Sequence, residues 1–209
     1  MTVIAVDGPS ASGKGTIAKA LARHFGLPHL DTGLLYRAVG HNVALMGGNP
    51  DDPGDALAAC AFPDAMLDDP VLRDERTGGL ASRVSVHPEV REALFKRQQD
   101  FAQQPGGAIL DGRDIGTVIA PDADAKLFVT ASVDARTERR VAEMERSGEV
   151  PDADEIRANI ERRDARDSSR AAAPLIPAID AHLLDTSDMT IDAAVREAIA
   201  AVNSRIEGR

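Results

Sequence analysis

The sequence has 209 residues, of which 43% are hydrophobic, and a formal net charge of −10, so it is long enough for one folded domain with inserted lobes. The acidic balance argues against a general binder of nucleic acid or anionic membranes, because such binding depends on excess Lys and Arg. The single Cys60 excludes an internal disulfide and a Cys-based zinc cluster.

The apolar runs and the first residues of the chain indicate where in the cell the protein is expected to reside. No run approaches the ~20 apolar residues that a membrane-spanning helix needs, and the first residues lack the basic segment of a signal peptide. We therefore expect a cytoplasmic protein with no membrane or nucleic-acid partner. No apolar stripe calls for a partner subunit, so a monomer is expected. Residues 206–209 resemble a protease-cleavage linker and are left out of the predicted fold.

Short apolar runs alternate with helical periodicity, which is typical of an α/β fold with a parallel sheet. The predicted strands are Val3–Val6, Leu27–Leu30, Ala108–Leu110, Lys126–Thr130 and His182–Leu184, and the predicted helices are Lys14–Phe25, Pro88–Gln104, Ser132–Ser147 and Ile191–Val202. Residues 1–36, 106–145 and 173–205 would form the core. Residues 37–105 are long for a crossover and are interpreted as an inserted lobe. Residues 146–172 are mostly charged or small, which predicts a solvated arm or a moving lid.

The turn after the first predicted strand carries the decisive motif, Gly8-Pro9-Ser10-Ala11-Ser12-Gly13-Lys14-Gly15-Thr16. A glycine-rich turn between a strand and a helix is the setting of a P-loop, in which backbone N–H groups and the helix N-terminus surround phosphates. Lys14 would add charge for the β- and γ-phosphates of ATP. Gly15 stands where many P-loops have a Mg²⁺-binding Ser or Thr, so Thr16 is predicted to contact phosphate rather than metal.

Two aspartates end strand-like runs on what would be the acceptor side. In a parallel sheet these carboxyl ends form the binding crevice. Asp111 resembles a Walker-B acid that orients Mg²⁺ through water, although a turn former is the alternative, and Asp31 is open between the same two interpretations. Arg37 and Arg113 follow the same strand ends. Two guanidinium groups suit an acceptor monophosphate, whereas a single one is commonly a surface ion pair.

The charged arm contains a third candidate cluster. On a helix Arg163, Asp167 and Arg170 would share one face. Arginines on a mobile segment can surround a transferring phosphoryl group after closure, which also excludes water. The alternative is a solvated helix whose charges balance. The P-loop favours the lid.

Over nearly its whole length the chain resembles bacterial cytidylate kinases. The resemblance rests on the P-loop, Asp31-Thr-Gly-Leu-Leu-Tyr-Arg37, Val90-Arg-Glu-Ala-Leu94, Asp111-Gly-Arg-Asp-Ile-Gly-Thr117 and the segment from Arg163 to Leu175. It implies a P-loop kinase fold with a five-stranded parallel sheet, an acceptor-binding lobe and a short lid. It also implies phosphoryl transfer from MgATP to CMP or dCMP.

The resemblance also implies roles for individual residues. Catalytic roles are implied for Lys14, Arg113, Arg163 and Arg170; contacts with the acceptor phosphate for Tyr36, Arg37 and Arg113; contacts with sugar and phosphate for Thr32, Asp167 and Arg170; and contacts with cytosine for Ser82, Arg91, Asp114 and Arg163. Arg139 and Arg140 match arginines at the lid base. An arginine can donate to the cytosine ring and Asp114 can accept from its amine, whereas uracil reverses this polarity and would leave buried groups unpaired.

Two departures from the family pattern are visible. The chain is short between Tyr36 and Ser82, so the match of Ser82 rests on its spacing to Arg91. Ala165 stands where the family often has an acid, and little loss of chemistry is expected from it.

Other functions compete with this interpretation. Another small P-loop kinase could act on UMP, AMP or shikimate, and Asp114 and Arg163 would then not read cytosine. A nucleotide-sensing module without turnover would need a degraded acceptor site, yet Arg37, Arg113 and Asp111 are all present. A purely structural protein is the least favoured alternative.

Overall fold

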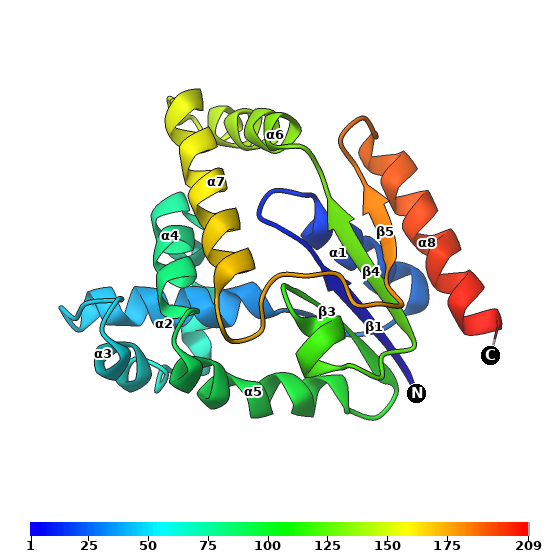
Figure 1. Ribbon diagram of the computed structural model, residues 1–209, viewed down its shortest axis with the longest axis horizontal. Helices are drawn as coiled ribbons and strands as arrows, with labels where there is room; N and C mark the ends of the chain where they lie inside the picture. Colours follow the sequence, from blue (N-terminus) through cyan, green and yellow to red (C-terminus); the bar gives the residue numbers. More distant parts are fainter. Residues whose placement is uncertain (209) are drawn as a thin grey trace.

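Five parallel strands form the central sheet in the order β2-β3-β1-β4-β5 (Figure 1). The computed structural model describes residues 1–208. The strands are β1 (Thr2–Asp7), β2 (His29–Asp31), β3 (Gly107–Gly112), β4 (Ala125–Thr130) and β5 (His182–Asp185). The helices are α1 (Lys14–Phe25), α2 (Thr32–Leu45), α3 (Pro53–Ala58), η1 (Asp64–Asp68), η2 (Pro70–Arg73), α4 (Glu75–Val84), α5 (Pro88–Ala102), η3 (Ile115–Ile119), α6 (Val133–Arg146), α7 (Ala153–Ser169) and α8 (Ile191–Glu207). The predicted α/β fold with a five-stranded parallel sheet is confirmed.

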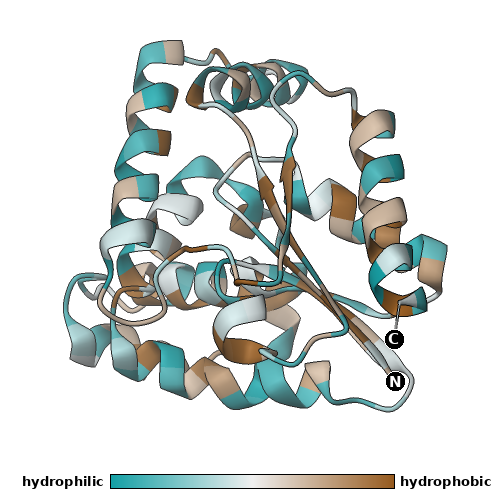
Figure 2. Ribbon diagram, turned by 45° about the vertical axis from the view of Figure 1, so that its right-hand side comes forward, coloured by the Kyte–Doolittle hydropathy of each residue, from teal (hydrophilic) through white to brown (hydrophobic). Residues whose placement is uncertain are grey.

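The sheet is covered on both faces, and the alternation along β1 shows how. Ile4 and Val6 point into a core formed with α1 and α8, whereas Val3 and Ala5 point into a second core with α5 and η3. Successive side chains of a strand face opposite sides of a sheet, so a strand covered on both faces is continuously apolar. Figure 2 shows hydrophobic residues gathered on the strands and on the inner sides of the helices. None of the helices in the described chain combines the length and apolar character that a membrane crossing needs.

The region between β2 and β3 has an apolar core of its own. Leu35 and Val39 of α2 pack with Val84 of α4 and with Val90 and Leu94 of α5. The sequence had predicted only the last of these helices. Because α2 begins directly after β2, a lobe boundary between residues 36 and 37 falls inside this helix. The division into core, lobe and lid stays a proposal.

The charged arm is packed, which contradicts the alternative of a solvated helix; the lid that the sequence favoured stays a proposal. One side of α7 buries Ile156 and Ile160 together with Arg163 and Asp167, and it lies against α6 and α4 (Figure 1). Two isoleucines four residues apart make a narrow apolar stripe that the surrounding charges conceal in the sequence. The helix ends at Ser169 and Arg170 is extended, so Arg170 does not continue the helix as predicted, although it is buried.

The C-terminal helix is longer than predicted. It runs from Ile191 to Glu207, and Ile206 packs against the core beside α1. The exclusion of residues 206–209 from the fold is therefore wrong for Ile206 and Glu207, and Arg209 lies outside the described residues.

Candidate active site

The loop before α1 has the backbone geometry that a phosphate cradle requires. Gly8 and Gly13 have φ angles of 153° and 87°, in a region that favours glycine. A Cβ on Gly8 would lie 2.0 Å from the carbonyl oxygen of Val129, so a side chain is also excluded by space. Ala11, at φ 59°, is an unexpected non-glycine residue with left-handed backbone. The Gly13 cap provides no side chain to the helix, which leaves the first N–H groups of α1 available for an anion.

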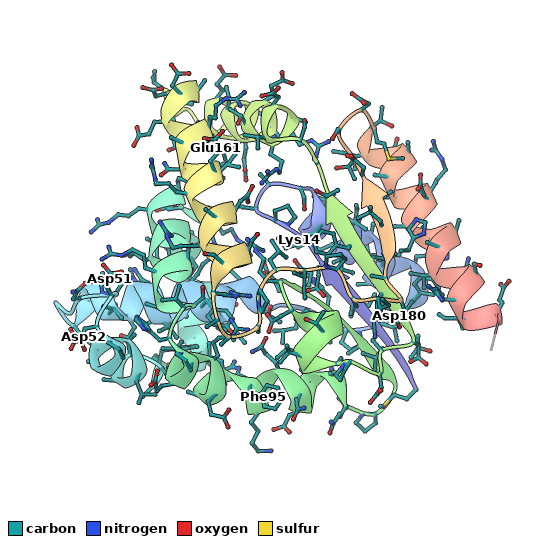
Figure 3. The ribbon with its side chains drawn as sticks, in the orientation of Figure 1. Lys14, Asp51, Asp52, Phe95, Glu161 and Asp180 are labelled. Carbon is teal, nitrogen blue, oxygen red and sulfur yellow. The ribbon has the colours of Figure 1, made fainter. Side chains whose placement is uncertain are left out.

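Lys14 lies at the centre of the molecule, whereas Asp51 and Asp52 lie at its outer edge (Figure 3). Burial, aided by the positive charge of Arg113, lowers the pKa of Lys14 to about 8, and the carboxylates of Asp111 and Asp31 oppose this shift. Within residues 1–208 the ammonium group makes no hydrogen bond or close ion pair. Lys14 is thus a cation placed to receive an anionic ligand.

Two carboxylates lie side by side near Lys14. Asp31 and Asp111 are opposite each other in the β2–β3 ladder, and burial, with the charge of Asp111, raises the pKa of Asp31. Asp111 Oδ1 is 2.6 Å from Nε2 of His29, a residue that the sequence did not single out. Paired carboxylate oxygens fit a Mg²⁺ ion that retains water and binds together with phosphates. In the described part of the chain no group of three or more His, Cys, Asp or Glu is placed to hold a metal ion.

A cleft of about 290 Å³ opens beside the P-loop at the carboxyl ends of the strands. Every residue that was predicted to contact the acceptor lines it: Thr32, Tyr36, Arg37, Ser82, Arg91, Arg113, Asp114, Arg163, Asp167 and Arg170. Ser10, Ala11, Lys14, Gly15, Asp31 and Asp111 line the same cleft. Of the other P-loop residues, Ser12 is buried and Thr16 is exposed to solvent.

Two of the residues predicted to read cytosine, Arg91 and Asp114, form a buried cluster with Tyr36 and Arg170. Asp114 makes an ion pair with Arg91, and the Arg91 guanidinium lies 5.5 Å from the ring centre of Tyr36. Arg170 Nη2 is 3.7 Å from the other oxygen of Asp114. Burial raises the pKa of the Tyr36 hydroxyl, so Tyr36 stays neutral. The arrangement offers donors and an acceptor within one small space, as recognition of a base edge requires.

Ser82 and Thr32 are held by partners from distant segments. The Ser82 hydroxyl accepts a hydrogen bond of 2.7 Å from Arg166 of α7, which the sequence did not single out. The Thr32 hydroxyl donates to the carbonyl oxygen of Asp111 at 2.9 Å. Both hydroxyl groups therefore face the cleft with their positions fixed.

The arginines predicted to bind phosphate are held in place by protein acceptors. Arg37 Nη1 donates to the carbonyl oxygens of Leu72 and Asp74 at 2.7 and 2.9 Å, and Arg113 Nε donates to Asp167 Oδ2 at 2.7 Å. Burial, together with the charge of a neighbouring arginine, lowers the pKa of Arg37 to about 10. Guanidinium groups held in this way are pre-oriented for an anion.

Buried donors without partners mark the same cleft. Arg163 Nε and Arg170 Nη2 are buried and make no hydrogen bond to any residue in the described chain, whereas Arg140 Nε meets Glu75 Oε2 at 3.0 Å as an ion pair. A buried charged donor that lacks an acceptor is costly, by roughly 1–3 kcal/mol or more. An anion with several oxygens would satisfy these groups, which favours a phosphorylated ligand.

Two further contacts lie beside the cleft, between residues to which the sequence alone assigned no role. Asp7 accepts hydrogen bonds of 2.8 Å from the N–H groups of Ile115 and Gly116, and burial raises the pKa of Asp7 to about 7. Arg136 of α6 makes a bidentate contact with Asp164 of α7 at 3.0 and 2.6 Å. These partners are far apart in sequence, so no local spacing reveals them.

Arg139 and Arg140, which matched arginines at the lid base, lie in different surroundings. Arg139 donates to the Thr186 hydroxyl at 2.9 Å, beside the P-loop. Arg140 lines the cleft and lies 3.0 Å from Glu75.

Solved structures support the fold. A gluconokinase from Sinorhizobium meliloti aligns with a TM-score of 0.55 and 15% identity over 99% of this chain and 94% of its own. An uncharacterized protein from Eubacterium ventriosum aligns with a TM-score of 0.57 and 16% identity over 98% of this chain and 99% of its own. At these identities the likeness concerns the fold alone.

Sequence relatives define the family. The cytidylate kinase family model matches residues 4–61 and 59–204. A cytidylate kinase of Xanthobacter autotrophicus is 54% identical over 207 residues, which cover 99% of this chain and 100% of the relative. One from Methylocella silvestris is 52% identical over 205 residues, or 97% of this chain and 94% of the relative. Because the family model matches most of the chain and these relatives share about half of its residues over nearly their full length, the chain belongs to the cytidylate kinase family.

Proposed function

We propose that the protein transfers the γ-phosphoryl group of MgATP to CMP or dCMP, giving ADP and CDP or dCDP. One observation carries the proposal. The residues that the family resemblance assigns to the acceptor come from separate segments of the chain, yet all of them line the cleft that contains Lys14. Membership of the cytidylate kinase family supports the same reaction.

On the donor side the backbone does most of the binding. The N–H groups of the P-loop and of the α1 N-terminus would surround the phosphates, and Lys14 would contact the β- and γ-phosphates. Asp111, with Asp31 beside it, would hold Mg²⁺ through water. The ion supplies positive charge that offsets the charge of the phosphates.

On the acceptor side the arginines would position the CMP phosphate and offset the negative charge of the phosphoryl groups. Arg37 and Arg113 would bind the CMP phosphate, which keeps its oxygen nucleophile in line with the γ-phosphorus. Arg163 and Arg170 have buried donors without acceptors, and these would meet the oxygens of the transferring group. Phosphoryl transfer needs little else from a protein than positioning and charge.

The base would be read by Asp114, Arg91, Ser82 and Arg163. A carboxylate accepts from the exocyclic amine of cytosine, and a guanidinium donates to its ring acceptors. Uracil presents a carbonyl at C4 and an N–H at N3, so it would leave Asp114 and an arginine without partners.

We also propose the lobe-and-lid organisation, with residues 37–105 holding the acceptor and residues 146–172 closing over the phosphates. Closure would exclude water and so limit hydrolysis of ATP. All the proposed site residues belong to one chain, which suits a monomer, and the substrates suit a cytoplasmic enzyme.

The proposal is tested by a coupled assay of ADP release with MgATP and each of CMP, dCMP, UMP, AMP and GMP. We expect fast turnover confined to CMP and dCMP. Turnover mainly with UMP or AMP would contradict the base-reading roles. Silence with all five would contradict nucleoside monophosphates as acceptors and point to another phosphate acceptor, such as shikimate.

A further inference from the structure

Glu75, the first residue of α4, carries a carboxylate that bridges two arginines across the cleft. Its Oε2 is 3.0 Å from Nε of Arg140 on α6, and its Oε1 is 3.4 Å from Nη1 of Arg163 on α7. The Glu75 side chain is 25% exposed, whereas those of Arg140 and Arg163 are 15% and 10% exposed. A carboxylate of the acceptor lobe thus lies between Arg163 of the proposed lid and Arg140 at its base.

The surroundings of this contact are crowded with positive charge. Burial lowers the pKa of Arg163, the charges of Arg113 and Arg140 lower it further, and Glu75 opposes the shift. The guanidinium group of Arg37 also lies close to that of Arg163. A Cβ on Gly78 would lie 2.8 Å from Arg37 Nη2 and 3.2 Å from Arg163 Nη1, so both guanidiniums converge over this glycine.

The bridge leaves the arginines incompletely satisfied. Glu75 meets Arg163 through Nη1 at 3.4 Å, and the buried Nε of Arg163 has no hydrogen-bond partner within residues 1–208. Arg140 Nε lies 3.0 Å from Glu75 Oε2 as an ion pair without the alignment of a hydrogen bond. A carboxylate has two oxygens, whereas a phosphate group presents three and carries more charge. Phosphate would therefore satisfy the same donors better.

We propose that Glu75 determines the affinity of the cleft, because its carboxylate competes with nucleotide phosphate oxygens for Arg140 and Arg163. In the ligand-free protein Glu75 compensates the arginines and links α4 to α6 and α7. An incoming phosphate must displace it, so each binding event loses this contact and each product release regains it. The identity of the phosphate as that of a nucleotide rests on the proposed function.

The chain offers a matched control in Glu143. Its Oε2 is 2.7 Å from Nη1 of Arg140, three residues earlier on the same helix, and its side chain is 59% exposed. Glu143 neutralises the same arginine but makes no ion pair with Arg163. Glu143→Gln therefore removes one negative charge near the cleft without removing the bridge.

The experiment compares the wild type, Glu75→Gln and Glu143→Gln by isothermal titration with tripolyphosphate, and then with ATP. We expect Glu75→Gln to bind tripolyphosphate more tightly by about 3- to 10-fold, since the competing conformation is lost. Glu143→Gln should stay within about twofold of the wild type, because exposed ion pairs contribute little. Tripolyphosphate has neither base nor sugar, so the result does not depend on CMP being the acceptor.

Several results would overturn the proposal. Weaker binding by Glu75→Gln would mean that Glu75 orients the arginines for the ligand, and unchanged binding would mean that it does not compete. Equal tightening in both variants would assign the effect to net charge alone. If circular dichroism shows that Glu75→Gln does not fold, Glu75→Asp takes its place. Its shorter side chain cannot span both arginines, so it should also bind more tightly than the wild type.

Discussion

The two parts of the cleft that we propose to bind the donor and the acceptor, called here the donor half and the acceptor half, are built in different ways. The donor half is one contiguous loop, residues 8–16, in which backbone N–H groups and two glycines define the shape. The acceptor half is assembled from side chains of α2, α4, α5, α7 and the segment after β3, and most of them are held by an ion pair or a hydrogen bond. A phosphate site can therefore be formed by residues that are contiguous in the sequence. A site that selects the acceptor needs residues that only the completed fold brings together.

Loss of Lys14 should give the largest effect and break the donor half alone. In Lys14→Ala we expect kcat to fall by about 10²–10³-fold with every acceptor, because a preorganised charge at the transferring group is lost. Circular dichroism should match the wild type, and the variant should unfold at the same temperature or a higher one, because burial of the charged lysine is costly. A variant with wild-type turnover would show that the loop does not hold the donor as proposed.

Loss of Asp114 should affect the acceptor half and leave the donor half intact. In Asp114→Ala we expect the ratio of kcat/KM for CMP over UMP to drop by about 10- to 100-fold, since the amine of cytosine loses its acceptor. KM for MgATP should change little. Equal losses on CMP and UMP would mean that Asp114 does not discriminate between bases. The substitution also removes the ion-pair partner of Arg91. Thermal unfolding of the variant therefore serves as a control that separates a loss of specificity from a loss of stability.

The pH dependence of activity tests the role of the Lys14 charge in the donor half. Burial lowers the pKa of Lys14 to about 8, so its charge is lost as pH rises through that value. We expect kcat/KM for MgATP to fall above pH 8 by about tenfold per unit. Lys14→Arg keeps its charge and should show no such decline. A wild-type profile that stays flat to alkaline pH would contradict this account.

The same shift has a consequence for stability. The folded state disfavours the charged form of Lys14, so between about pH 8 and the unfolded value of 10.5 the unfolded chain binds more protons. Charged Lys14 therefore lowers the free energy of unfolding below about pH 8, and this cost is lost as pH rises toward 10.5. Urea unfolding at both ends of the window would measure it: Lys14→Ala is expected to be more stable than the wild type at about pH 8, and the difference should shrink toward pH 10.5.

Substitution of His29, which lies at the boundary between the two halves, should give the smallest effect. Its contact with Asp111 fixes one carboxylate oxygen, and residues that orient a metal ligand commonly matter for affinity. In His29→Phe we expect the Mg²⁺ concentration for half-maximal activity to rise by about 5- to 10-fold. His29→Gln, which keeps a donor, should lie nearer the wild type. Mn²⁺ binding with ATP, followed by electron paramagnetic resonance, should weaken in parallel, and identical binding would contradict the role.

The sequence predicted what depends on neighbouring residues. The P-loop, the first helix from Lys14 to Phe25 and the strand ends at Asp31 and Asp111 all follow from short runs of residue types. The resemblance then brought distant arginines to the same site, and they line one cleft. Even Ser82, matched only by spacing to Arg91, lies there.

What the sequence did not predict depends on partners far along the chain. His29 meets Asp111 across 82 residues, and Asp7 meets Ile115 across 108 residues. The sequence alone assigned no role to Glu75, because the two arginines that it contacts lie on two later helices. The buried side of α7 was missed because two isoleucines among many charges give a weak pattern, and only packing against α6 and α4 shows that it is a contact surface.

The central claim is that the two halves bind their ligands independently, and the affinity of CMP for Lys14→Ala tests it most directly. CMP would be titrated into the wild type and the variant without ATP. The account predicts that the variant loses turnover and still binds CMP within about twofold of the wild type, because independent sites have additive effects. A collapse of CMP affinity in Lys14→Ala would contradict the separation of donor and acceptor halves.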